Sequence, residues 1–146
     1  MYNLERIITA IKDIESFFKT LDSMKIGTIQ DLEEDIKYHA SSMLCLAIIN
    51  RTIDIASEIL VKEAISMPAK YRDIFSSLSK EGILSKEIGQ VMERLVEHRN
   101  FLAHEYEGLN KKMLIGIIRD VREVKLFVER IKKFIEKRQK NEQEAN

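Results

Sequence analysis

The chain has 146 residues, of which 45% are hydrophobic and 33% charged, and its 24 Lys and Arg balance 24 Asp and Glu. This composition is typical of a single globular domain and excludes an intrinsically disordered chain. No stretch approaches the roughly 18 uninterrupted apolar residues of a membrane-spanning helix, and no signal-peptide pattern opens the sequence. We therefore expect a cytoplasmic protein that does not contact membranes.

The zero formal net charge also constrains the partners. Without a global positive field, a polynucleotide would have to be bound by a local basic patch. Basic residues do cluster at Lys111–Lys112 and at Lys132–Lys133, Lys137, Arg138 and Lys140. Such runs on a long helix are more often a solvated face than a binding site.

Apolar residues repeat at helical spacing along the chain, and only one proline and five glycines interrupt them. The first predicted helix starts at or near Asn3 and ends before Gly27. Thr28 is the predicted N-cap of a second, longer helix, which must have ended by Pro68. A short third helix is expected around residues 71–78.

Ser85 is the predicted N-cap of a fourth helix, and Asn110 is the predicted N-cap of a long last helix. Phe127 and Phe134 fall off the apolar stripe of that last helix, which favours packing against a second chain. Residues 140–146 are expected to form a frayed tail. The sequence thus predicts an all-α fold, an antiparallel up-and-down bundle of four to five helices, in one domain over residues 1–139.

The chemically richest segment reads RNFLAHEY, from Arg99 to Tyr106, at the end of the fourth predicted helix. Asn100 and His104 are four residues apart and share a helical face, so the amide could orient the imidazole. Arg99 and His104 lie about 140° apart around an ideal helix. They converge only if the helix ends between them or if the long arginine wraps around it.

Arg99 and His104 together suit the cleavage of RNA. An imidazole exchanges protons near neutral pH, so His104 could remove the proton of a 2′-hydroxyl that attacks the adjacent phosphorus. A guanidinium can hold the phosphate oxygens and offset the charge that grows on them. This chemistry needs neither a metal nor a cofactor. A second His104 could protonate the leaving 5′-oxygen, so the motif predicts a homodimer with a composite cleft.

The pattern R-N-x3-H-x-Y resembles the signature of the HEPN superfamily, and within it that of the HepT-like toxins encoded beside a minimal nucleotidyltransferase antitoxin. The resemblance extends through the segments Thr52–Ala56 and Met92–Glu97, and covers the chain from about Tyr38 to the end of the last helix. It implies a helical bundle that dimerises into a metal-independent endoribonuclease. Such a protein would be the toxin of a type VII-like toxin–antitoxin system.

The same resemblance assigns a role to each residue of the motif. Arg99 and His104 would be catalytic, and Asn100 would support them. Tyr106 would be the residue that the cognate nucleotidyltransferase modifies with AMP. A nucleotidyl group on this phenol would add phosphate charge and bulk where RNA phosphates must bind, which explains how modification could neutralise the enzyme.

Two other functions stay open, because an Arg and a His five residues apart occur in many unrelated helices. The chain could be a non-catalytic helical module that binds a nucleotide or escorts a nucleotidyltransferase. Its neutral charge and the awkward geometry of the dyad favour this alternative. It could also be a helical scaffold in which the motif is coincidental.

Several other polar residues are better explained by structural roles. Cys45 lies in an apolar run, where a buried, unreactive thiol is expected. His98 is interpreted as a solvated or interface residue, and His39 lacks the neighbours that would complete a metal site. Asp54 either pairs with Arg51 or another basic residue or lies near the cleft, and pairing is the favoured interpretation.

Overall fold

The computed structural model describes residues 4–104 and 108–145, which form helices and no strand. In chain order they are α1 (Glu5–Ser23), the 3₁₀ helix η1 (Ile29–Glu33), α2 (Asp35–Lys62), α3 (Arg72–Lys80), α4 (Lys86–Glu97), α5 (Arg99–Ala103), α6 (Lys111–Val121) and α7 (Val124–Ala145). If α4–α5 and α6–α7 are each counted as one broken helix, these residues contain five α-helical rods. The predicted all-α bundle is confirmed. In the described part of the chain, no helix is both long and apolar enough to cross a bilayer.

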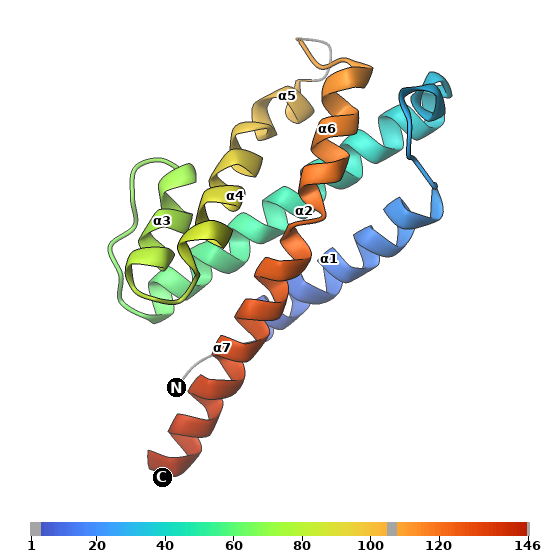
Figure 1. Cartoon of the computed structure of the whole chain (residues 1–146). Coiled ribbons are helices and arrows are strands. Elements are labelled where there is room, and N and C mark those ends of the chain that lie inside the picture. The colour runs from blue at the N-terminus through green and yellow to red at the C-terminus, as the bar shows by residue number, and fades with distance from the viewer. Residues whose placement is uncertain (1–3, 105–107, 146) are drawn as a thin grey trace.

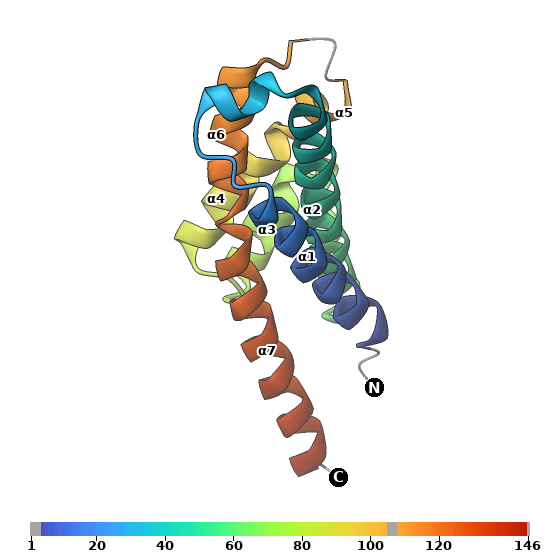
Figure 2. The same cartoon turned by 90° about the vertical axis from the view of Figure 1, so that its right-hand side faces the viewer.

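The long helices run back and forth along the molecule (Figures 1 and 2). The helices α1 and α2 lie side by side in opposite directions, and α4–α5 returns along α2. The helices α6 and α7 then lead away again, and the far end of α7 projects beyond the other helices. As a result, α5 lies at one end of the bundle, far from the start of α1 and from the end of α7.

One apolar core joins all these helices, and Phe127 belongs to it. This side chain is completely buried and packs edge-to-face on Phe75 of α3, with 5.9 Å between the ring centroids. The expectation that Phe127 faces a second chain is therefore wrong, and Phe134 is itself partly buried against this core. The cause is the break between α6 and α7 at residues 122–123, which resets the helical phase on which the predicted stripe depended.

The second predicted helix is also divided. The side chain of Thr28 and the carboxylate of Asp31 form a capping box, but it starts η1 rather than the long helix. Asp31 accepts hydrogen bonds from the backbone N–H groups of Gly27 and Thr28, at 2.8 and 2.9 Å, and these lower the pKa of its carboxyl. The helix α2 begins only at Asp35.

Two predicted caps are confirmed. Ser85 Oγ accepts a hydrogen bond from the backbone N–H of Ile88 at 3.1 Å, and Asn110 Oδ1 accepts one from Met113 at 2.9 Å. The predicted cap at Asn3 lies outside the described residues. At the other end, α7 continues to Ala145, past the point at residue 140 where we expected a frayed tail.

The thiol of Cys45 is buried in α2, as predicted. Burial raises its pKa to about 12. Because the thiolate is the reactive form, this residue contributes to packing and not to chemistry.

Candidate active site

The motif lies where the helical path is interrupted twice. The helix α4 ends at Glu97, His98 forms a turn, and α5 contains only Arg99–Ala103. His104 follows α5 with φ −121° and ψ 58°, outside the helical region. The helix thus ends between Arg99 and His104, which is one of the two conditions under which their side chains can converge.

The side chain of Arg99 is held against α2. Its Nε donates a hydrogen bond to Oδ1 of Asn50 at 2.8 Å, and both side chains are half-buried. Its Cζ lies 5.4 Å from the centroid of the Tyr71 ring, within the range of a cation–π contact. Among the described residues, the guanidinium forms no ion pair. One edge of the guanidinium is thus fixed, and its Nη groups are available to an anion.

His104 and Asn100 are both exposed at this end of the bundle. The backbone N–H of His104 donates to the backbone carbonyl of Asn100 at 3.1 Å, which ties the two residues together at the end of α5. The expected support of the imidazole by the Asn100 amide stays a prediction. Tyr106 lies outside the described residues.

The sequence did not identify Asn50 and Tyr71 as partners of Arg99. The only signal for Asn50 is a polar residue that interrupts the apolar run of α2, directly after Ile49. Tyr71 precedes α3 and remains 56% exposed, which is unusual for a large aromatic residue with no partner to stack on. Its contact with the guanidinium accounts for this placement.

His98 lies next to Arg99 in sequence but contacts a different helix. Its Nε2 lies 3.9 Å from Oδ2 of Asp120 on α6, whereas Arg99 contacts α2. The structure therefore places the side chains of His98 and Arg99 against different helices. In the described part of the chain, no group of three or more His, Cys, Asp or Glu side chains could hold a metal ion.

The favoured interpretation of Asp54 is confirmed. Arg51 lies between two carboxylates, with Nε 3.0 Å from Asp13 on α1 and Nη1 3.5 Å from Asp54 on its own helix. The pair with Asp13 joins α1 to α2, and the pair with Asp54 lies within α2.

An apolar strip leads along α2 toward the motif. It consists of Ile36 and Met43, which are 76% and 59% exposed and lie seven residues apart. Another seven residues along α2 is Asn50, the partner of Arg99. Because a spacing of seven returns to nearly the same helix face, the apolar strip and Asn50 share one side of α2.

Residues 7–131 match the Ribonuclease HepT-like family. A curated relative, the mRNA nuclease HepT of Shewanella oneidensis, is 24% identical over 113 residues, which cover 77% of this chain and 84% of the relative.

Solved structures share the fold. One is a toxin–antitoxin with AMP-PNP, with a TM-score of 0.80 and 20% identity over 88% of this chain and 98% of that chain. Another, a tri-AMPylated HEPN toxin of Shewanella oneidensis in complex with MNT antitoxin, has a TM-score of 0.80 and 21% identity over the same shares. The cytosolic protein YutE of Bacillus subtilis has a TM-score of 0.78 and 21% identity over 94% of this chain and 95% of its own. With the family match over most of its length, the chain belongs to the Ribonuclease HepT-like family.

Proposed function

We propose that this chain is the endoribonuclease toxin of a toxin–antitoxin pair and that it acts in the cytoplasm. The observation that carries the proposal is the interrupted helix at the motif, in a chain of the Ribonuclease HepT-like family. The interruption leaves Arg99 fixed by Asn50 and His104 exposed beyond the end of α5. This arrangement supports phosphate binding by Arg99 and proton transfer by His104.

In the proposed reaction, His104 takes the proton of a ribose 2′-hydroxyl, and this oxygen forms a bond to the adjacent phosphorus. The bond from phosphorus to the 5′-oxygen breaks, which leaves a 2′,3′-cyclic phosphate. The leaving oxygen takes a proton from the second protomer's copy of His104. The Nη groups of Arg99 donate to the nonbridging phosphate oxygens, and no metal is needed.

The second protomer would dock on the apolar strip, Ile36 and Met43. These side chains are the kind of exposed apolar surface that a partner usually covers. A two-fold dimer that buries the strip also brings a second motif toward the first, because the strip leads to Asn50 and Arg99.

The double substitution Ile36→Glu/Met43→Glu tests this dimer. Placing two carboxylates in a buried interface is strongly unfavourable, so we expect a monomer at concentrations where the unsubstituted chain is a dimer. RNA cleavage should fall in parallel. Light scattering coupled to gel filtration measures the mass. The matched control is Leu126→Glu on α7, which is 50% exposed and lies outside the strip. A double variant that stays dimeric would refute the docking surface.

We also propose that the cognate nucleotidyltransferase neutralises the toxin by attaching AMP to Tyr106. The support is the R-N-x3-H-x-Y pattern, together with a structural neighbour that is itself an AMPylated toxin in complex with its antitoxin. Incubation with the nucleotidyltransferase and ATP should add AMP to the peptide that contains Tyr106, as measured by mass spectrometry. Tyr106→Phe should accept none there and should keep cutting RNA in the presence of the antitoxin. AMP found on another residue would reassign the site.

The alternative is a non-catalytic module that binds a nucleotide or escorts the nucleotidyltransferase. The zero net charge favours it, because affinity for RNA is weak without a local patch. Purified chain incubated with RNA in a chelator separates the two functions. Cleavage supports the enzyme, whereas binding without cleavage at every protein concentration supports the module.

A further inference from the structure

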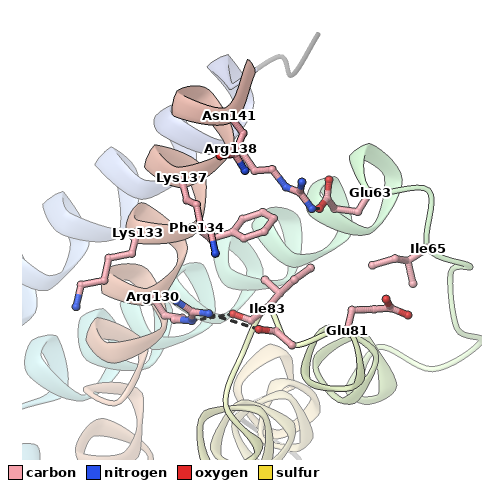
Figure 3. Close-up of a pocket in the computed structure, with 11 residues that line it drawn as sticks. Glu63, Ile65, Glu81, Ile83, Arg130, Lys133, Phe134, Lys137, Arg138 and Asn141 are labelled. Carbon is pink, nitrogen blue, oxygen red and sulfur yellow. Dashed lines mark hydrogen bonds and ion pairs between the residues drawn. The ribbon is translucent and has the colours of Figure 1, made fainter. Parts of the chain in front are cut away.

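A second charged site lies away from the motif, where α7 passes the end of α2 and the turn between α3 and α4 (Figure 3). It is a pocket of about 430 Å³. Four cationic side chains of α7 line it, namely Arg130, Lys133, Lys137 and Arg138, together with the carboxylates of Glu63 and Glu81. Cationic side chains therefore outnumber carboxylates in this pocket, although the chain as a whole has zero net charge.

Two of the cations are fixed as walls of this pocket. Arg130 donates from Nε to the carbonyl of Ile83 at 2.9 Å and from Nη2 to that of Gly82 at 3.4 Å. Arg138 forms an ion pair with Glu63, and its Cζ lies 5.3 Å from the centroid of the Phe134 ring. These contacts hold α7 against the turn and neutralise one of the two carboxylates.

The remaining two cations, Lys133 and Lys137, differ from Lys125 and Lys132 of the same helix in their partners. Lys125 and Lys132 form ion pairs with carboxylates of α1, Asp22 and Glu15, at 3.4 and 3.5 Å. Within the described part of the chain, Lys133 and Lys137 form no such pair, although both line the pocket. They lie one helical turn apart, so their ammonium groups can contact neighbouring anionic groups of one ligand.

We propose that this pocket, through Lys133 and Lys137, binds the phosphate backbone of substrate RNA at a distance from the scissile bond. The inference rests on the proposed ribonuclease activity. The pocket and the motif lie at opposite ends of α4, whose 12 residues span about 18 Å, or roughly five stacked nucleotides. A single strand cut at the motif can thus reach the pocket only if it extends beyond that length.

Binding is best measured with the full-length His104→Ala chain, which should not cut its ligand, and a labelled single-stranded RNA of about 20 nucleotides, long enough to span both sites. We expect Lys133→Gln/Lys137→Gln to weaken binding about tenfold near physiological salt. It should also reduce the slope of log affinity against log salt by about 1.4, or about 0.7 for each lost phosphate contact. The control Lys125→Gln/Lys132→Gln removes the same charge from the side of α7 that faces α1 and should leave the slope unchanged.

RNA length provides the second measurement. An RNA of about three nucleotides cannot span the two sites, so both double variants should cut it like the unsubstituted chain. Equal effects of the two double variants on the longer RNA, or no binding of that RNA by the His104→Ala chain, would overturn the inference. If either of these outcomes is found but the unsubstituted chain cuts RNA, the ribonuclease proposal still stands. If the lysines bind RNA that no variant cuts, the ribonuclease proposal fails, and the pocket is an RNA-binding site but not a site for a substrate.

Discussion

We expect His104→Ala to lower the rate of RNA cleavage by about a hundredfold to ten-thousandfold, the usual contribution of a general acid or base. In a composite dimer site, the substitution removes both the group that takes the 2′-hydroxyl proton and the group that protonates the leaving oxygen. His104 is exposed beyond the end of α5, so the fold should tolerate the smaller side chain. The thermal unfolding midpoint and the dimer mass should not change.

The measurement is initial-rate cleavage of a labelled RNA with a chelator present. His98→Ala is the matched control, since it removes a neighbouring imidazole that lies near Asp120 on α6. This control should retain nearly all activity. Equal losses of activity in the two variants would contradict the catalytic role. So would a loss of activity in His104→Ala that matches the fraction of unfolded protein.

The second large effect concerns Asn50, which we expect to act as a positioning residue. A hydrogen bond to a charged group contributes about 1.5–3 kcal/mol, so Asn50→Ala should lower cleavage about 10- to 100-fold by releasing Arg99 Nε. Asn50→Asp keeps an oxygen acceptor at the same place. It should therefore recover most of the activity, although its negative charge offsets part of the positive charge of the guanidinium.

Coupling to Arg99 distinguishes positioning from a general loss of stability. Once Arg99→Ala has removed the guanidinium, adding Asn50→Ala should reduce cleavage no further. Both substitutions disable the same functional unit, the guanidinium positioned by Asn50. Cleavage rates of the two single variants and the double variant form the cycle, and unfolding midpoints are measured alongside. Additive losses, or an Asn50→Asp variant as impaired as Asn50→Ala, would show that Asn50 does not act through Arg99.

The parts of the fold that follow from local pattern were predictable. Helical spacing indicates an all-α bundle, and Ser85 and Asn110 cap the helices they were expected to cap, because a cap depends on residues within one turn. The breaks at His98 and at residues 122–123 were not predictable. Neither is marked by glycine or proline, so tertiary packing overrides a continuous local pattern at both places.

The candidate site likewise has a part that the sequence predicts and a part that it does not. The pattern R-N-x3-H-x-Y indicates Arg99 and His104 as candidates, but not Asn50, which lies 49 residues before Arg99 and contacts it. Periodicity indicates which side of a helix faces inward, yet it does not identify the side chain on another helix that meets it. Finding the partner of Arg99 required the packing of α5 on α2.

The short length of α5 also affects when the site forms during synthesis. A helix of five residues is unstable alone, so it depends on α2, through the buried Leu102 and the contact of Arg99 with Asn50. During translation α2 emerges first, and Arg99 emerges 49 residues after its partner Asn50. A chain with the proposed RNA-cutting activity is built on a ribosome, itself largely RNA. We expect this late assembly to keep the growing polypeptide from cutting its own ribosome and message until most of the protein has been made.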